Sequence, residues 1–517
     1  MSSYASFQTQ HGQLGSFRLN YANSAIIVLS SFLLFRVGLV AYRLWFHPLR
    51  RFPGPKTWAA SDLPYIYTAN ITGTGIRQIS DFHRKYGPVV RVGPNRLAMD
   101  GSVGWPQVYA RRSAGEAEFE KAPGHFAPGF SKSIIASPKD VHRRQRRQLG
   151  YAFSDAAMHE QEPIIEQYVR LLGDRIHEHA ASGKEMNIVQ WLNFTTFDII
   201  GDLTFGESFG SLESSNYHPW VLSIFQGIKG DSFQRACRNY RTLEPLLRYV
   251  FGDKNSNKGD ENRDLSGKKG RARMEQGLEP KGRRDFITYM MQPNRDGHSG
   301  FSLDEIMANA PLLVVAGSET TASALSGLFF YLSQTPRVKR ILVEEIRSAF
   351  DDESEITMVS TNKLEYLHAT LEETLRVYPP AAGTPPRASP GAEIEGKFVP
   401  KGTVVHVTQW TTFRNPEHFF APDSFYPERW LRKDHSLYDP KFDNDNHAVF
   451  KPFSHGPRDC IGKNLAYSEM RLIVSHLLYK FDVEALPGQD DWHAKQTTFN
   501  IWDKGPLYMK FTTRERQ

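Results

Sequence analysis

The chain has 517 residues, 40% of them hydrophobic and 23% charged, and a formal net charge of +6. This composition can build a large core, so it excludes an intrinsically disordered chain. The two cysteines, Cys237 and Cys460, exclude a disulfide framework and indicate a reducing compartment. Because lysine and arginine are spread along the chain, nucleic acid is not expected as a partner. A basic surface also suits docking to an acidic redox protein or an anionic membrane, but charge alone favours a surface that is only solvated.

The first predicted element is a membrane anchor. Residues 21–46 are largely apolar, and about 20 such residues are enough to span a bilayer as a helix. Arg36 lies inside this stretch, where insertion costs about 2.5–3.5 kcal/mol. Interfacial aromatic residues follow at Tyr42, Trp45 and Phe46. A cleaved signal peptide is the alternative, but no small-residue cleavage site follows the apolar stretch.

The charges around the anchor predict its orientation. Only Arg18 precedes it, whereas Arg43 lies near its C-terminal end and Arg50, Arg51 and Lys56 follow it. The positive-inside rule then places the main domain in the cytosol and residues 1–20 in the lumen as a tail. Residues 47–56 are rich in proline and predict a stiff hinge between the anchor and the domain.

Residues 57–517 show no repeat and no clear linker, so we expect one large domain. Residues 86–100 alternate in polarity around Gly-Pro turns and predict a β-hairpin. Between residues 139 and 480 the apolar spacing is mostly helical. Residues 253–284 are charged and glycine-rich, which favours a mobile surface loop over a partner-docking loop. Short strand patterns return after residue 380, so the predicted fold class is mainly α with small β-sheets.

The stretch "FSHGPRDCIG" (453–462) contains Cys460. A lone cysteine is often a small buried hydrophobe, but Gly456 and Gly462 allow positive φ and a close approach of the backbone to a flat ligand. A predicted helix begins just after the cysteine, and its positive end favours a thiolate and metal binding. A cysteine protease would need a partnered histidine. His455 is nearby, but no orienting Asn or Asp stands at a recognisable spacing.

Three further stretches contain residues that suggest chemistry. Glu373 and Arg376 share one face of a predicted helix, as many exposed ion pairs do. Residues 312–332 form a very apolar helix with Gly317, Glu319 and Thr320 at its centre, where a buried acid needs compensation. A second membrane span is the alternative for this helix, and Glu319 disfavours it. Residues 413–431, which include Arg429, predict a packed coil.

Together, in this order, these stretches resemble the cytochrome P450 family of haem-thiolate monooxygenases. The cysteine stretch is similar to the family's Phe-x-x-Gly-x-Arg-x-Cys-x-Gly signature, and residues 316–321 resemble its Ala/Gly-Gly-x-Asp/Glu-Thr-Thr helix motif. The family's Glu-x-x-Arg pair corresponds to Glu373 and Arg376. Its Pro-Glu-Arg-Phe motif corresponds to residues 427–430, with Trp430 in place of Phe. The resemblance covers residues 50–515 and implies the cytochrome P450 fold with an N-terminal transmembrane helix.

The resemblance implies a role for each matching residue. Cys460 would be the axial ligand of the iron of haem b, and Phe453 would pack near its sulfur. Glu319 and Thr320 would deliver protons during oxygen activation, with Gly317 making room for oxygen. The family's structural triad would be formed by Glu373, Arg376 and Arg429 and would lock the cysteine loop. The remaining haem contacts would come from Gly456, Gly462, Arg458, Arg387, His142 and Arg146, with His142 where the family often has Trp.

The resemblance also implies the reaction. The anchor and hinge are similar to those of microsomal members, and "HRRQRRQLGYAFS" and "FDIIGDLTFGESFG" resemble fungal enzymes of secondary metabolism. We therefore expect a single-pass protein of the endoplasmic reticulum membrane that oxidises a lipophilic small molecule, such as a terpenoid or polyketide. Electrons would come from NADPH–cytochrome P450 reductase, because the chain shows no dinucleotide motif of its own. Substrate contacts are expected in residues 220–250, 381–385 and 499–502. A haem-thiolate isomerase or dehydratase, or a non-catalytic haem scaffold, is the alternative.

Overall fold

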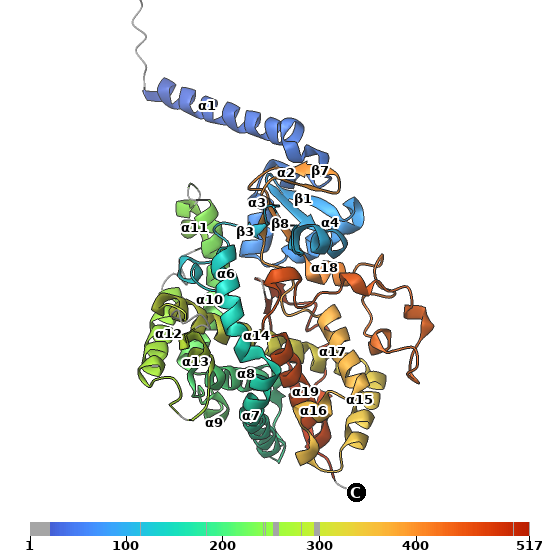
Figure 1. The fold of residues 1–517 in the computed structure, drawn as a ribbon. Coiled ribbons are helices and arrows are strands. Elements are labelled where there is room, and N and C mark those ends of the chain that lie inside the picture. Colours follow the sequence, from blue (N-terminus) through green and yellow to red (C-terminus); the bar gives the residue numbers. More distant parts are fainter. Residues whose placement is uncertain are drawn as a thin grey trace, which may run out of the picture.

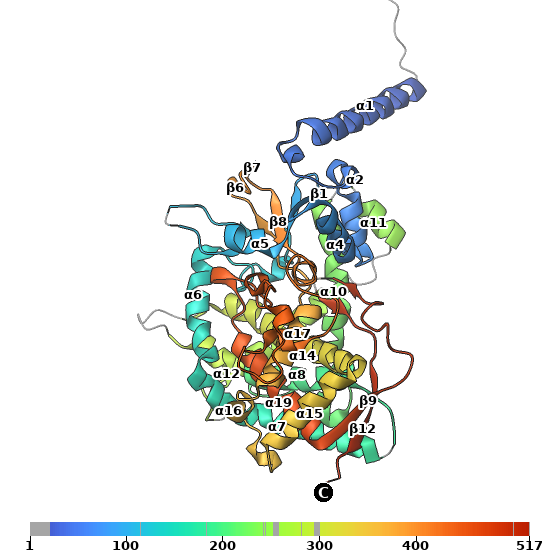
Figure 2. The ribbon, with the colours of Figure 1, turned by 90° about the vertical axis from the view of Figure 1, so that its right-hand side faces the viewer.

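The computed structural model describes residues 21–515 except 114, 182, 241, 243, 252–257, 281, 294–299 and 500, so the predicted tail 1–20 lies outside the described residues. Most described residues are helical, and small sheets lie near the anchor and at the opposite end of the domain (Figures 1 and 2). The α-helices are α1 Tyr21–Ala41, α2 Lys56–Ala60, α3 Leu63–Tyr65, α4 Gly75–Tyr86, α5 Gly101–Gly104, α6 Lys139–Leu149, α7 Asp155–Ala181, α8 Ile188–Phe205, α9 Ser211–Ser214, α10 Pro219–Asn239, α11 Glu244–Phe251, α12 Lys258–Glu275, α13 Phe286–Met291, α14 Leu303–Gln334, α15 Pro336–Ala349, α16 Met358–Thr361, α17 Glu365–Val377, α18 Gln409–Phe413 and α19 Lys463–Lys480. The predicted fold class, mainly α with small β-sheets, is confirmed.

Helix α1 stands apart from the domain. It projects from the end of the molecule that contains the larger sheet (Figures 1 and 2). Residues Asn23–Phe46 are apolar enough to cross a membrane, with a mean hydropathy of 2.2, and none of this stretch is buried against the domain. An exposed apolar helix of this length is a candidate membrane span, as expected.

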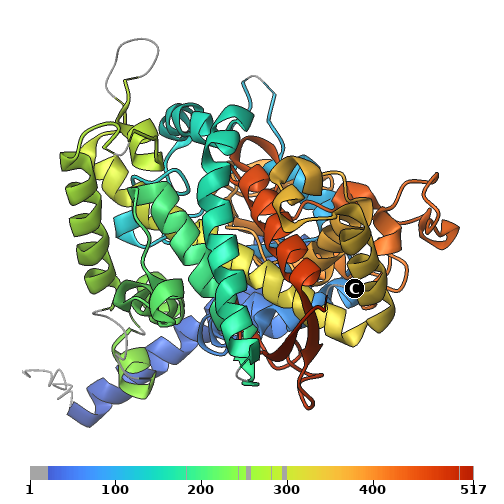
Figure 3. The ribbon, with the colours of Figure 1, turned by 90° about the horizontal axis from the view of Figure 1, so that it is seen from below.

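The core is built around α14. Ser302 and Glu305 form a capping box at its start, and the helix continues unbroken through Gly317 and Pro311. It packs against α8, α17 and α19, and α19 in turn lies beside α7 (Figure 3). Although α14 is apolar enough to span a membrane, 72% of its apolar window is buried inside the domain. It is therefore the central helix of the domain, and the alternative of a second membrane span is wrong.

The larger sheet has the strand order β1-β2-β8-β5-β3. Strands β1 and β2 form the predicted hairpin, with Val89 opposite Met99, and β2 continues in parallel with β8. The smaller sheets are β4-β12-β9, β10-β11 and β6-β7. The strands are β1 Val89–Gly93, β2 Arg96–Met99, β3 Glu120–Lys121, β4 Met186–Asn187, β5 Arg387–Ala388, β6 Ala392–Ile394, β7 Lys397–Val399, β8 Val404–Val407, β9 Phe481–Ala485, β10 Thr497–Thr498, β11 Trp502–Asp503 and β12 Tyr508–Thr513.

The predicted loop at residues 253–284 is wrong for its central part. Residues Lys258–Glu275 form α12, which packs against α10 and α14. Lysine, arginine, glutamate and alanine are good helix formers, and Arg273 is buried in an ion pair with Asp285 at the start of α13. The charge and glycine content of this segment predict a loop because its tertiary partner, Asp285, is not visible in the local pattern. Residues 253–257 and 281 lie outside the described part.

Candidate active site

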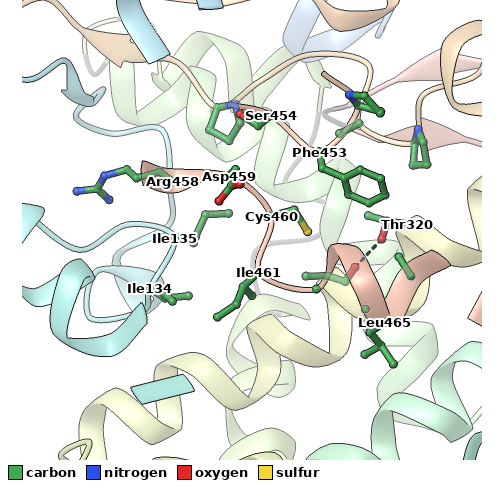
Figure 4. Close-up of a pocket in the computed structure, with 18 of the residues that line it drawn as sticks. Ile134, Ile135, Thr320, Phe453, Ser454, Arg458, Asp459, Cys460, Ile461 and Leu465 are labelled. Carbon is green, nitrogen blue, oxygen red and sulfur yellow. Dashed lines mark hydrogen bonds between the residues drawn. The ribbon is translucent and has the colours of Figure 1, made fainter. Parts of the chain in front are cut away.

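A cavity of about 310 Å³ lies between α14 and the loop before α19. Cys460 lies on that loop and lines the cavity, and Thr320 from α14 lines it as well (Figure 4). The N–H of Cys460 donates to the carbonyl of Phe453 at 2.9 Å, which closes the loop into a tight turn. Most other walls are apolar, with Leu312, Leu313, Ala316, Ala324, Ile461, Leu465 and Ala466 among them.

The pKa of the Cys460 thiol is raised, whereas the sequence predicts a site that favours the thiolate. Burial raises its pKa, and the N–H of Gly462 and the charge of Arg146 only partly offset this effect. Helix α19 begins at Lys463 with Gly462 as its N-cap, so Cys460 lies two residues before the N-cap and meets the helix start through the N–H of Gly462. The N–H of Gly462 favours the thiolate, but burial of the sulfur outweighs this contribution. A coordinated metal ion would deprotonate the thiol by its own charge.

Gly456 and Gly462 of the cysteine loop have different structural roles. Gly456 has φ +78°, and a Cβ at this position would lie 2.0 Å from the carbonyl oxygen of Tyr109, so no other residue fits. Gly462 has φ −88°, and a Cβ there would make only an ordinary contact with Phe153. The expected positive φ is thus found at Gly456 and is wrong at Gly462, which instead supplies a backbone donor to the cysteine.

On α14 the two adjacent polar residues face different spaces. Thr320 lines the cavity, and its hydroxyl donates to the carbonyl of Ala316 at 2.7 Å. Glu319 is not among the residues that line this cavity. It lines a separate space of about 290 Å³, where Lys504 donates to its carboxylate and Ser323 lies nearby. Burial raises the pKa of Glu319, while Lys504 opposes the shift.

Gly317 borders the cavity, but a Cβ there would meet Ile200 of α8 at 2.5 Å. The glycine is therefore required for the close packing of α14 against α8. Ile200 itself lines the cavity, so a larger residue at 317 would also change the cavity wall.

One edge of the cavity gathers positive charge. Arg387, Arg458 and Lys121 line it together, and the pKa of each is lowered, first by burial and in Lys121 and Arg458 also by neighbouring cations. The buried Nε of Arg387 has no hydrogen-bond partner among the described residues. Lys121 lies directly opposite Arg387 because β3 pairs with β5. Buried cations with unused donors fit the carboxylates of a bound ligand.

His142 and Arg146 of α6 are only partly available for such a ligand. His142 lines the cavity, and burial together with Arg458 and Arg146 lowers its pKa to about 3, so it is neutral. Arg146 also lines the cavity, but its guanidinium binds the Asp459 carboxylate at 2.6 Å. Arg146 therefore also anchors the cysteine loop.

Glu373, Arg376 and Arg429 meet in the core, away from solvent. Two nitrogens of Arg376 donate to the Glu373 carboxylate at 2.8 Å each, and Arg429 lies 3.0 Å from it. Burial would raise the pKa of Glu373, but the two arginines hold it below its ordinary value. The N–H of Tyr426 and the indole of Trp430 donate to the same carboxylate, which fixes the 413–431 coil. The alternative of an exposed ion pair is wrong here.

Three residues that the sequence did not single out lie at or beside the site. Lys121 completes the cationic edge, and Lys504 pairs with Glu319. Glu469 of α19 lines the cavity, and its carboxyl is hydrogen-bonded to Thr321. Burial raises the pKa of Glu469 to about 8, so it is mostly protonated at neutral pH. Of these three residues, only Glu469 could have been found from the sequence pattern, because it is an acid on the apolar face of a predicted helix.

The expected substrate segments separate in space. Residues 381–385 contribute to the wall of the cavity through Ala381, Gly383, Thr384 and Pro385. Parts of 220–250 line a second cavity, and Phe499, Ile501 and Trp502 line the space beside Glu319.

Comparison with known proteins identifies the family. The family model described as Cytochrome P450 matches residues 63–511. The chain belongs to the cytochrome P450 family. It is 40% identical to the cytochrome P450 monooxygenase astJ of Aspergillus oryzae, over 92% of this chain and 94% of that protein. It is 39% identical to the averantin hydroxylase of Dothistroma septosporum, over 94% and 91% of the two chains. It is also 39% identical to the trichothecene C-15 hydroxylase of Fusarium sporotrichioides, over 92% and 95%.

This P450 is thus an oxidoreductase of the monooxygenase class, with relatives in fungal secondary metabolism. The family implies a haem-thiolate cofactor, and the residues fit one. Cys460 faces an apolar cavity, and the unused donor of Arg387 stands in a cluster of cations suited to the propionates. A haem held there supplies oxygen binding and electron acceptance. For such a haem, Cys460 would supply the sulfur ligand, and Arg387, Arg458 and Lys121 would supply cations at one edge of a mainly apolar cavity.

Proposed function

We propose that this P450 inserts one oxygen atom from O₂ into a lipophilic small molecule, using haem b and electrons passed from NADPH by a separate NADPH–cytochrome P450 reductase. The observation that supports this most directly is that Cys460 and Thr320 line one apolar cavity. A sulfur ligand and a hydroxyl in the same pocket suit oxygen activation, whereas an isomerase would not need proton delivery.

The proposed substrate is a terpenoid, a polyketide or a related intermediate of secondary metabolism. Two relatives are named for the hydroxylation of averantin and of trichothecenes, so related chemistry is reasonable for this chain. The mainly apolar lining of the cavity agrees with a lipophilic molecule.

The proposed location is the endoplasmic reticulum membrane, crossed once by α1, with the domain on the cytosolic side and residues 1–20 in the lumen. The exposed apolar helix and the cations that follow it support this orientation.

Several residues have proposed roles in the reaction. Thr320 would hold and pass a proton inside the cavity, and Glu319 would exchange protons with the space on the other side of α14. The triad of Glu373, Arg376 and Arg429 would keep the cysteine loop in place, and Phe453 would cover the sulfur. Arg387, Arg458, His142 and Lys121 would bind the haem edge.

The first test concerns Cys460 as the axial ligand of the haem iron. The reduced, CO-bound protein should show the red-shifted Soret band of thiolate ligation, and Cys460→Ser should abolish it. Cys237→Ser is the matched control, because Cys237 is buried beside Ile66 and Leu247 and is not among the residues that line the cavity. A band typical of histidine ligation would overturn the assignment.

The reaction is tested with reductase, NADPH and candidate metabolites. We expect oxygen uptake and NADPH consumption with a product that is heavier by one oxygen atom. A product that forms without oxygen uptake would favour the isomerase or dehydratase, and a protein inert toward NADPH and O₂ would favour the scaffold.

A further inference from the structure

A second cavity, of about 380 Å³, lies beside the haem cavity. Gly383 and Thr384 line both cavities, so the segment that contains them is the shared wall. Gly383 has no side chain, so it contributes only backbone atoms to this wall, and its Cβ position lies in ordinary contact, at 3.7 Å, with the carbonyl oxygen of Val407. A molecule held in the haem cavity could therefore extend toward the second cavity at this point.

The sheet places two basic side chains in the second cavity. In the parallel pairing of β2 with β8, Arg96 lies opposite Val404 and Ala98 opposite His406. Side chains on a strand alternate between faces, so Arg96 and His406 project from the same face of the sheet. Both line the cavity, together with Thr408 just after β8 and Arg235 of α10.

Three residues that line this cavity each have a buried polar atom without a hydrogen-bond partner among the described residues: Arg96 Nε, His406 Nδ1 and Thr408 Oγ1. His406 is only 7% exposed and Thr408 only 4%. Buried polar groups are normally satisfied, so these atoms indicate a place for a polar ligand group.

The charge in the cavity is positive. Arg96 lies over the ring of Tyr65 at 4.1 Å, and Arg235 is paired with Asp231. Burial and then Arg96 lower the pKa of His406 to about 3, and burial and then Arg235 lower the pKa of His125 well below its ordinary value. Both imidazoles are therefore neutral and can donate hydrogen bonds.

Two acidic residues lie close to these cations, Asp231 beside Arg235 and Asp62 in the cavity wall. Asp62 is the single carboxylate among the described residues that line the second cavity, and the hydroxyl of Tyr240 is hydrogen-bonded to it. Arg235 is already paired with Asp231, so Arg96 is the guanidinium that suits an anionic oxygen ligand in this cavity.

We propose that this second cavity binds an anionic oxygen group of the substrate, a carboxylate in the simplest case, while the apolar part of the same molecule lies in the haem cavity. Arg96 would pair with the anion, and His406 and Thr408 would donate hydrogen bonds to it. The inference rests on the proposed function and narrows its substrate class from lipophilic molecules to lipophilic acids.

The test uses the haem-loaded full-length protein in detergent micelles. Decanoate, decan-1-ol and decyltrimethylammonium are titrated in turn, and binding is followed by the haem spectrum and by calorimetry. We expect decanoate to bind about tenfold more tightly than decan-1-ol, and the cation to bind most weakly. The preference for decanoate should shrink as salt is raised.

Substitutions test whether the preference for decanoate arises from the second cavity. Arg96→Gln should weaken decanoate about tenfold and leave decan-1-ol unchanged, and Arg96→Lys should restore part of the preference. Arg340→Gln is the control, because Arg340 lies on α15 with its side chain 67% exposed. The CO-bound spectrum of each variant shows whether its haem site is intact.

Equal affinities of the wild-type protein for decanoate and decan-1-ol would overturn the inference, and so would an equal loss of both in Arg96→Gln. If Arg96→Gln does not fold, the inference is tested by the preference of the wild-type protein for decanoate over decan-1-ol and by the salt dependence of that preference. A protein that has the thiolate spectrum and turns over metabolites but shows no preference would contradict this inference alone. Selective binding of decanoate without any oxygenation would contradict the proposed function alone.

Discussion

Lys504 and Glu319 form an ion pair on the side of α14 that faces away from the cavity lined by Thr320. Their side chains are only 4% and 3% exposed. Successive residues of a helix point about 100° apart, which explains how an acid and an alcohol adjacent in sequence serve two different spaces. The second oxygen of Glu319, Oε2, has no partner among the described residues, so it is available to a water or a proton carrier.

Lys504→Met should move the pH dependence of kcat. Burial already raises the pKa of Glu319 and Lys504 opposes the shift, so removing the cation should raise this pKa further. We expect the limb of the kcat profile that Glu319 controls to move to higher pH, and kcat at neutral pH to fall about tenfold. Lys504→Arg should retain the wild-type profile. Lys510→Met, at an exposed position of β12, is the control. A kcat profile that does not move in Lys504→Met would show that Glu319 takes no part in proton delivery.

Thr320→Ala should uncouple the reaction. The hydroxyl that lines the cavity is lost, so NADPH is still consumed while the product per NADPH falls about tenfold and peroxide rises. Ser326→Ala is a matched control on the same helix, since its hydroxyl also donates to the carbonyl four residues back and is buried outside the cavity. Unchanged product per NADPH in Thr320→Ala would show that the hydroxyl has no part in proton transfer.

Glu373→Gln should be severely destabilising. It would leave the guanidinium groups of Arg376 and Arg429 buried without their shared carboxylate, at a cost of about 3–5 kcal/mol. Thermal unfolding and haem content of the purified protein measure the effect. Arg432→Gln removes a pair with Glu365 in which the arginine side chain is 70% exposed, and it should cost less than about 1 kcal/mol. Similar stability of the two variants would contradict the structural role of the triad.

Glu469 should make stability depend on pH. Its pKa is about 8 in the folded chain against an ordinary 4.5, so between these values the folded protein holds a proton that the unfolded chain has lost. Stability from this group is therefore present below about pH 4.5 and is lost as pH rises toward 8. Glu469→Gln should be more stable than the wild type by a few kcal/mol at pH 8, with a smaller difference at pH 5. Thermal unfolding at the two pH values measures this, and a gap that does not change with pH would exclude the buried acid.

Lys121→Met and Arg387→Met should weaken haem binding. Each removes a cation from the edge of the cavity, and one charged hydrogen bond is worth about 1.5–3 kcal/mol. Transfer of haem to a scavenger protein should therefore be faster by about tenfold or more. Lys401→Met, at an exposed turn, should retain haem as the wild type does. Equal rates in all of these proteins would place the propionates elsewhere.

Much of the fold followed from local patterns. The hairpin of β1 and β2, the helices α8, α14 and α19 and the apolar anchor α1 lie where periodicity and turn residues placed them. Helix α12 did not, because its stability depends on packing against α10 and on the pair of Arg273 with Asp285. A charged, glycine-containing segment reads as a loop when the groups that bury it are distant in sequence.

The sequence by itself determined the family and the residue that would hold the haem, since Cys460 and the motifs around it are local and specific. Only the tertiary structure decided how these residues are used. It turned Glu319 toward Lys504, set Lys121 opposite Arg387, and placed Arg96 and His406 on one face beside the haem cavity. The physical reason is that burial and electrostatic pairing depend on groups separated by hundreds of residues along the chain, and no local spacing records those contacts.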